Sequence, residues 1–220
     1  MTDASATDQA VTGATIRLWI EKTAAVLAEN RAHLCELDSP IGDADHGNNM
    51  DRGYKAVLEK LPAGGDDVGA LLRSVAMTLI SKVGGAAGPL YGTFFLEAGK
   101  PLAGQTALSP AALAQLFADG VAGVARRGRS EAGMKTMLDA LMPAADALKA
   151  HLEDGKDVAG ALAAAAAAAK AGMEATIPMQ AQRGRASYLG ERSIGHQDPG
   201  ATSSYLIVQA LSDAVADMPQ

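Results

Sequence analysis

The sequence predicts an all-α fold, a bundle of about eight helices joined by short connections. Apolar residues recur at 3-4 spacing in most segments, which is the pattern of one buried helix face. Hydrophobic residues make up 48% of the chain but aromatic residues only 4%, so the core is built from Ala, Leu, Val, Ile and Met, a composition typical of helices. Sustained alternating, β-branched patterns are absent, which argues against a sheet.

The N-terminal region divides into a tail and a first helix. Residues 1–13 are small and polar and are expected to form a flexible tail, so that a single domain spans residues 14–220. One face of the first helix is predicted from residues at 3-4 spacing: Ile16, Trp19, Ile20, Thr23, Leu27 and Leu34.

The middle of the chain repeats the same pattern between breaks marked by Gly or Pro. One helix face is formed by Val68, Leu72, Val75 and Leu79, and the next by Leu113, Leu116, Phe117, Val121 and Val124. Ser109 and Pro110 mark the start of the second of these helices, because Ser is a favoured N-cap and Pro a favoured first helical residue.

The C-terminal part predicts three further helical segments. The first follows from Met134, Leu138, Leu141, Leu148 and Leu152. Pro143 lies inside this segment, so it is either one kinked helix or two helices. Seven consecutive alanines, 163–169, lie within a helix expected from about Val158 to Ala175, which we interpret as a closely packed structural helix. A last helix is expected from about Gly200 to Val215.

Composition excludes several classes of function. The net charge is −6 and no stripe of Lys and Arg with interleaved aromatics occurs, which argues against a nucleic-acid partner. The single cysteine, Cys35, excludes an internal disulfide, and the chain opens without a signal-peptide pattern, so a cytoplasmic location is expected. No apolar run approaches the length of a membrane span. The composition leaves open whether the chain associates with copies of itself.

The most informative segment is 38–49, with the sequence DSPIGDADHGNN. Pro40 and the glycines disfavour regular structure, so we expect a loop that gathers Asp38, Asp43 and Asp45 around one point. Three neighbouring carboxylates repel one another unless a cation lies between them. Oxygen ligands favour Mg²⁺, Ca²⁺ or Mn²⁺ over zinc, and the segment therefore predicts a divalent metal site.

Two other interpretations of this segment, an EF-hand and helix capping, fit it less well. An EF-hand counted from Asp43 would need Gly at its sixth position and Glu at its twelfth, where the chain has Asn48 and Tyr54. Capping of the following helix would explain one aspartate but not three. His46 is a solvent-facing residue, a base or a donor to phosphate; Asn49 is an N-cap, a phosphate ligand or both.

Two more segments have a composition suited to anions. Segment 84–93, GGAAGPLYGT, could expose backbone N–H groups to an anion, with Pro89 as a first helical residue, although close helix packing explains its glycines equally well. Segment 184–200, GRASYLGERSIGHQDPG, places Arg185 and Arg192 among glycines, next to Arg183, as a lid or clamp for phosphates. Its Asp198-Pro199-Gly200 is also an ordinary turn before a helix.

Metal-binding carboxylates, a glycine-rich segment and an arginine-rich segment together suggest phosphoryl transfer. The strings IGDADHG (41–47), VGGAAGPL (83–90) and the segment 184–200 resemble the nucleotide-binding subunits of bacterial dihydroxyacetone kinases, from about residue 14 onward. This resemblance implies a barrel of eight antiparallel helices with the nucleotide held by loops at one end.

The resemblance also implies roles for individual residues. Asp38, Asp43 and Asp45 would hold two Mg²⁺ ions that bridge the phosphates of ADP or ATP, and with Arg185, which would face the phosphates, they form the expected catalytic set. The remaining expected nucleotide contacts are His46, Gly47, Asn48, Asn49, Ala87, Gly88, Thr136, Met137, Asp198, Pro199 and Gly200. Within this set, Thr136 and Met137 of the string GMKTM would pack near the base. Family members often carry Ser where this chain has Ala87, so a hydroxyl contact to phosphate is lost there.

In the family, the ketone is bound by a separate subunit K, and this chain lacks room for that site. The resemblance therefore implies half of a kinase, which passes phosphate to dihydroxyacetone or a longer ketose such as erythrulose. ADP would either stay bound and be rephosphorylated by a phosphotransferase-system subunit M, or exchange with free ATP. The alternative from another class is a nucleotide-binding regulatory protein that docks without transferring phosphate.

Overall fold

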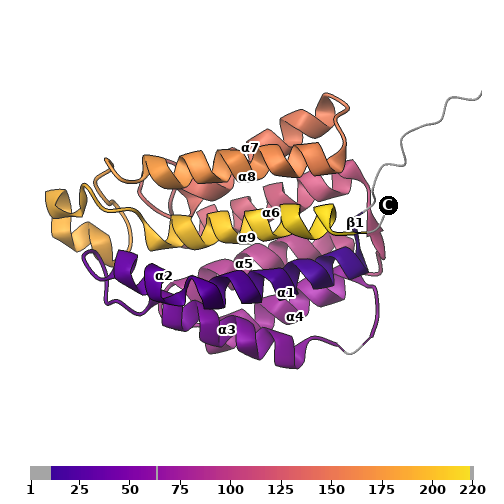
Figure 1. Cartoon of the computed structure of the whole chain (residues 1–220), viewed down its shortest axis with the longest axis horizontal. Coiled ribbons are helices and arrows are strands. Elements are labelled where there is room, and N and C mark those ends of the chain that lie inside the picture. Colours follow the sequence, from indigo (N-terminus) through magenta and orange to yellow (C-terminus); the bar gives the residue numbers. More distant parts are fainter. Residues whose placement is uncertain (1–10, 63, 219–220) are drawn as a thin grey trace, which may run out of the picture.

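The computed structural model describes residues 11–62 and 64–218, and within them the chain folds into a barrel of long helices (Figure 1). The elements, in order, are β1 (Val11–Thr12), α1 (Gly13–Glu29), α2 (Arg31–Asp38), α3 (His46–Lys60), α4 (Val68–Lys82), α5 (Ala87–Gly99), η1 (Lys100–Leu102), β2 (Ala107–Leu108), α6 (Pro110–Gly128), α7 (Leu138–Glu153), α8 (Val158–Ala175), η2 (Arg185–Ser193) and α9 (Pro199–Ala216). The all-α prediction is confirmed, apart from the short antiparallel pair β1–β2.

Eight of these helices form a closed ring. Each of α3 to α8 packs against the next helix in sequence, and α1 closes the ring by packing against both α3 and α9. The side chain of Trp19 on α1 helps to close it, because its Nε1 donates to the carbonyl of Ile207 on α9 at 2.8 Å and its ring lies 5.5 Å from that of Phe95 on α5. Short α2 continues from α1 toward one end of the barrel (Figure 1).

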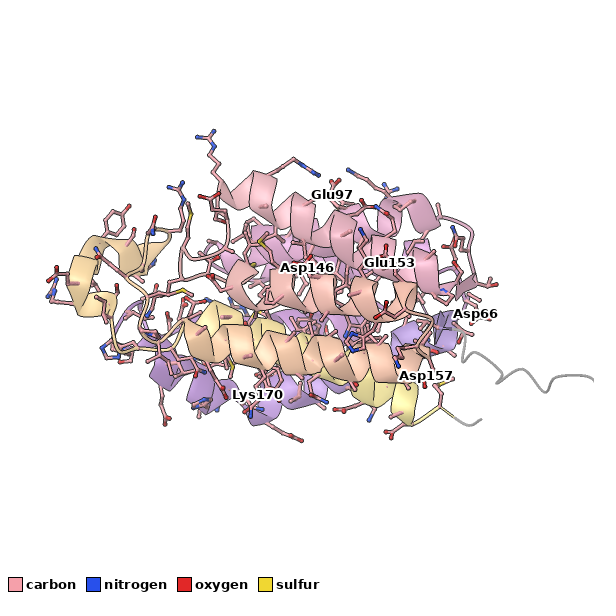
Figure 2. All side chains as sticks on the ribbon, turned by 90° about the horizontal axis from the view of Figure 1, so that it is seen from above. Asp66, Glu97, Asp146, Glu153, Asp157 and Lys170 are labelled. Atoms are coloured by element: carbon pink, nitrogen blue, oxygen red, sulfur yellow. The ribbon has the colours of Figure 1, made fainter. Side chains whose placement is uncertain are left out.

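The core is a single large cluster of aliphatic side chains supplemented by a few aromatic ones. The alanine-rich helix α8 runs over the predicted residues and packs closely between α7 and α9, as the interpretation as a structural helix requires. Charged side chains such as Asp146 and Lys170 are exposed on the outside of the barrel (Figure 2).

Several predicted boundaries need correction. The first helix ends at Glu29, because the side chain of Asn30 competes for the carbonyl of Val26 (2.8 Å), and Leu34 therefore belongs to α2. Met134 precedes α7 and lies outside it. Of the expected tail, residues 1–10 lie outside the described residues, whereas 11–13 form β1 and begin α1, with Thr12 as N-cap.

Pro143 leaves α7 as one helix rather than two. Proline removes the hydrogen bond to the carbonyl four residues earlier, here that of Asp139. Gly172 of α8 lies directly against this carbonyl: a Cβ at residue 172 would be 2.0 Å from the Asp139 oxygen and 3.0 Å from Pro143 Cγ. The glycine thus lets α8 approach the proline-containing turn closely.

Within the described residues, no helix is long and apolar enough to cross a membrane.

Candidate functional site

Four connections between helices meet at the end of the barrel where η2 lies (Figure 1). They enclose a cavity of about 770 Å³. Its lining comes from the α2–α3, α4–α5, α6–α7 and α8–α9 connections, which are the segments that the sequence singled out as functional. The lining includes these predicted site residues: Asp38, Asp43, Asp45, His46, Asn49, Ala87, Thr136, Met137, Arg185, Asp198, Pro199 and Gly200.

The three predicted aspartates converge. Asp38, Asp43 and Asp45 each offer a carboxylate oxygen within 4.8 Å of the other two. Asp38 is buried at the end of α2 and holds the loop in place: its Oδ2 accepts hydrogen bonds from the backbone N–H groups of Asp45 (2.9 Å) and His46 (3.2 Å). Capping of the following helix therefore accounts for Asp38, but leaves Asp43 and Asp45 exposed toward the cavity.

The donor set of this cluster fits a hard divalent cation. All three side chains supply carboxylate oxygens, which Mg²⁺ prefers, and their mutual repulsion is relieved by a cation between them. Arg185 of η2 offsets one charge, since its guanidinium lies 2.9 Å from Asp43 Oδ2 while its side chain stays 70% exposed. The predicted metal ligand Asp43 and the predicted phosphate contact Arg185 thus meet directly.

His46 connects the aspartate loop to the interior of the barrel. Its Nε2 lies 2.8 Å from the hydroxyl of Ser203 on α9, and that hydroxyl lies 2.6 Å from the hydroxyl of Tyr91 on α5. The Tyr91 hydroxyl also bonds Ser204 (2.8 Å) and the carbonyl of Gly200 (3.0 Å). Burial lowers the pKa of His46, against the opposing effect of the nearby Asp38 and Asp45 carboxylates. The side chain of His46 is therefore engaged with α9, unlike a solvent-facing loop residue.

Asn49 does not cap a helix. Asp45 occupies the N-cap position of α3, and Asn49 is the fourth residue of that helix, where it is buried in the cavity lining. Its side chain lies against Gly84, where an added Cβ would be 3.0 Å from Asn49 Oδ1. The phosphate-ligand prediction for Asn49 is compatible with this place, and the N-cap prediction is wrong.

The glycines of the α4–α5 connection serve both of the purposes considered. Gly85 adopts a left-handed backbone (φ 66°) with open space around it, as a turn facing a ligand requires. Gly88 is a packing residue, because a Cβ there would lie 2.3 Å from the carbonyl of Val83. Helix α5 begins at Ala87, so Pro89 is its third residue and not its first, and Ala86 supplies no side-chain cap to the backbone N–H groups beside the cavity.

The α6–α7 connection owes its shape to two residues that sequence reasoning missed. The carboxylate of Asp139 accepts from the backbone N–H groups of Gly133 (2.5 Å) and Thr136 (2.7 Å). Lys135, only 1% exposed, bonds backbone carbonyls of the α8–α9 connection. Burial lowers the pKa of Lys135, while Asp198 opposes this shift. The available signal for Lys135 was its place in the string GMKTM, which resembles the base-side loop of the family, whereas Asp139 lies among apolar helix residues and gave no signal.

Asp198 is the N-cap of α9 and lines the cavity as well. Its Oδ2 accepts from the N–H of Ala201 at 2.7 Å, which confirms the turn interpretation of this segment. Burial raises the pKa of the Asp198 carboxyl to about 7; the Ala201 hydrogen bond works against this shift, and the Asp139 carboxylate adds to it. Three predicted contacts lie outside the cavity lining: Gly47 packs against the carbonyl of Arg31, Asn48 accepts from the Arg31 side chain, and Gly88 packs as described.

Comparison with known proteins gives consistent results. The DAK2 domain model matches residues 40–213. The chain is 47% identical over 200 residues to the ADP-binding subunit of the PEP-dependent dihydroxyacetone kinase of Escherichia coli, covering 90% of this chain and 95% of the relative. Identity is 40% over 199 residues to the ADP-binding subunit of the PTS-dependent dihydroxyacetone kinase of Lactococcus lactis, again over 90% and 95% of the two chains.

A solved structure shares the fold. The crystal structure of the dihydroxyacetone kinase from C. freundii in complex with AMP-PNP and Mg²⁺ superposes with a TM-score of 0.68 at 28% identity. The match covers 97% of this chain but only 36% of the other, so the present chain spans about a third of that longer kinase. From the family match over residues 40–213 and the identity to these kinase subunits over most of its length, the chain belongs to the DAK2 domain family, and the resemblance inferred from its motifs is confirmed.

Proposed function

We propose that this chain is the nucleotide-binding half of a dihydroxyacetone-type kinase and that the cavity at the η2 end of the barrel holds ADP or ATP. The observation that carries the proposal is the meeting, in one cavity, of a carboxylate cluster, an uncapped helix N-terminus and an arginine. These are the parts that phosphoryl transfer requires, because the protein mainly positions phosphates and balances their charge. The names of the relatives support the same assignment.

In this proposal Asp38, Asp43 and Asp45 hold two Mg²⁺ ions. When bound, Mg²⁺ would neutralise charge on the nucleotide phosphates. The fit rests on the convergence of the three carboxylates and on the rigid support of Asp38 by two backbone N–H groups. Arg185 is then free to exchange its carboxylate partner Asp43 for a phosphate, at little cost because the pair is exposed.

The nucleotide is oriented by groups on three connections. The backbone N–H of Ala87 at the start of α5 faces the phosphates, helped by the positive end of the helix dipole, whereas Gly88 contributes by letting the helix start pack closely. His46 and Asn49 border the same part of the cavity, with Gly47 and Asn48 supporting that turn. Thr136 and Met137 lie beside the base, and Asp198 to Gly200 close the cavity on the α9 side.

The reaction breaks the bond between the γ-phosphorus and the β–γ bridging oxygen and forms a bond from that phosphorus to a ketone hydroxyl oxygen, whose proton passes to a base. Arg185 supplies fixed positive charge where negative charge spreads in the transition state. The cavity lining described above is used by the nucleotide, so the ketone, dihydroxyacetone or a related ketose, is held by a separate subunit K that docks at the η2 end.

We further propose that ADP is a resident cofactor rephosphorylated in place by a phosphotransferase-system subunit M, as the names of the Escherichia coli and Lactococcus lactis relatives suggest for those proteins. A cytoplasmic location fits this role, and the single cysteine, which forms no disulfide, is consistent with a reducing compartment.

Calorimetry of ADP binding tests the assignment. With Mg²⁺ the chain should bind ADP tightly, and with excess chelator the affinity should fall at least about tenfold, because the phosphates and the carboxylates then repel each other. Equal binding with and without Mg²⁺ would contradict the proposed metal site, and no ADP binding in either condition would contradict the proposed function.

A further inference from the structure

Lys135 is the one buried lysine in the part of the chain that the structure describes, and it makes an unusual set of contacts. Its Nζ donates to the backbone carbonyls of Thr176 (2.8 Å), Met179 (3.1 Å) and, at longer range, Ile177 (3.4 Å), and also to that of His196. All these acceptors are neutral. A buried ammonium is costly unless its three N–H donors are satisfied, so carbonyls from both residues 176–179 and residue 196 must stay within reach of it.

The acceptors lie at the two ends of one excursion of the chain. Residues 176–179 leave α8 and residues 195–198 return to α9, and the chain between them carries η2 with Arg185. We call these two stretches the neck. Two further bonds join its sides: Gly195 N–H donates to the Ile177 carbonyl (2.8 Å), and Asp198 N–H to Thr176 Oγ1 (3.0 Å). Lys135 thus reaches the neck from outside and bonds both of its sides.

The loop that carries Lys135 is itself fixed. Lys135 has a left-handed backbone (φ 59°), which a non-glycine residue adopts only when its surroundings hold it there. The Asp139 carboxylate supplies that hold through its hydrogen bonds with the backbone of residues 133 and 136. A bond from Gln182 N–H to the Met134 carbonyl (3.1 Å) adds a second link between this loop and the excursion.

We propose that Lys135 is a positioning residue, which locks the neck to the loop bearing Thr136 and Met137 and so sets Arg185 relative to the bound nucleotide. The role of Arg185 in this proposal rests on the proposed function. The hydrogen-bonded link from Lys135 to the neck, which we call the lock, is a property of the free protein. Arg185 lies on η2, which the neck joins to α8 and α9 and which otherwise rests on the small apolar cluster of Ile41, Ala181 and Ala186, so a loosened neck weakens the hold on the guanidinium beside the cavity.

The lock is tested first without nucleotide, by limited trypsin digestion followed by mass spectrometry. Arg183 and Arg185 are exposed cleavage sites, and cleavage in a folded protein follows local opening. Lys135→Met keeps an unbranched side chain, one atom shorter, but removes its donors, and it should raise cleavage after these arginines at least about fivefold. Lys170→Met, which loses only a surface ion pair on α8, should cleave at the wild-type rate.

The second test measures turnover with the ketone-binding subunit present. If Lys135 acts through Arg185, then Lys135→Met combined with Arg185→Ala should have the same kcat as Arg185→Ala alone, within about twofold. The proposal would be overturned if the double variant lost kcat by the product of the two single losses. It would also be overturned if a folded Lys135→Met variant were cleaved at the wild-type rate. If wild-type protein neither binds Mg-ADP nor turns over while the cleavage results hold, the proposed function fails and the lock stands.

A variant that fails to fold is also informative. Lys135→Gln reaches as far as Lys135→Met but keeps an N–H₂ donor, so it should fold and show a cleavage rate between those of wild type and Lys135→Met. If both variants lose the cooperative thermal transition of the wild type, Lys135 supports the whole barrel and not the neck, and the proposal is wrong.

Discussion

Replacing Asp45 by Asn should have opposite effects on the free and the ligand-bound protein. In the free protein, Asp45 lies within 4.8 Å of both Asp38 and Asp43. Two unit charges at that distance repel by about 1 kcal/mol in water-like surroundings, and by about 3 kcal/mol at an effective dielectric constant of 20. Asp45 is exposed, so the lower value applies to each pair.

Asp45→Asn removes this repulsion and so stabilises the metal-free protein. Part of the stabilisation is offset, because Asp45 lies at the N-cap of α3, where a negative charge is favoured by about 0.5 kcal/mol. The free energy of unfolding of metal-free Asp45→Asn should therefore equal or exceed that of wild type by about 1 kcal/mol. Bound to Mg-ADP at a hundred times its Kd, the wild type gains about 2.7 kcal/mol. For a chain of this size that gain raises Tm by roughly 5–10 °C, and Asp45→Asn should lose most of it.

The assay is thermal unfolding followed by circular dichroism, in chelator and in Mg-ADP. Asp146→Asn is the matched control, because Asp146 is exposed on α7 away from the cavity (Figure 2) and changes the net charge equally. Asp45→Asn that retains the full Mg-ADP shift would refute the account of the carboxylate cluster, and so would a metal-free variant markedly less stable than wild type.

Three other variants test separate parts of the site. Arg185→Ala should lower kcat at least about hundredfold with little change in Tm, since among the described residues its guanidinium pairs only with the exposed Asp43; a loss of activity that merely follows a lower Tm would make Arg185 structural. Tyr91→Phe should cost about 1–3 kcal/mol in urea unfolding, because it deprives Ser203 and Ser204 of their shared partner, whereas Tyr54→Phe should cost less, because the Tyr54 hydroxyl has no hydrogen-bond partner among the described residues. Asp198 binds its proton more tightly folded (pKa about 7) than unfolded, so in chelator stability should fall as pH rises from about 4 to about 7. The groups that face it are Lys135, which opposes the shift, and Asp139 and Asp38, which add to it. Asp198→Asn keeps the N-cap and should reduce the change in unfolding free energy between about pH 4 and about pH 7 by on the order of 2 kcal/mol, a value already lowered for the partial exposure of Asp198. An unchanged pH profile would show that Asp198 ionises freely.

Local patterns were sufficient for most of the helices. Ser109 and Pro110 begin α6 as expected, since capping depends on neighbours three residues away. The alanine-rich helix α8 has the predicted bounds, because alanine favours helix wherever it packs. A boundary failed where a side chain competes with the helix, as at Asn30. At Pro143 the sequence left one helix or two open, and the contact with Gly172 on α8 that accompanies the single helix α7 lies too far along the chain for the pattern to show.

The residues of the site also fall into those that the sequence pattern could identify and those that it could not. The aspartates and Arg185 could be singled out because such residue types at such spacing have few structural uses. Lys135, Tyr91 and Ser203 could not, because their partners are far along the chain: the Tyr91–Ser203 contact spans 112 residues and the contact from Lys135 to the carbonyl of His196 spans 61. Only the closed ring of helices brings these groups together.

The central claim is that this chain carries the phosphate and a second protein carries the ketone. The most direct test is a coupled assay of dihydroxyacetone phosphorylation by the purified chain loaded with Mg-ADP and supplied with phosphorylated subunit M as the phosphoryl donor, with and without the ketone-binding subunit. We expect negligible turnover by the chain alone, although calorimetry of the same preparation shows nucleotide bound, and turnover restored when the subunit is added. Robust phosphorylation by the chain alone, in a preparation shown by mass spectrometry to be free of other subunits, would contradict the account.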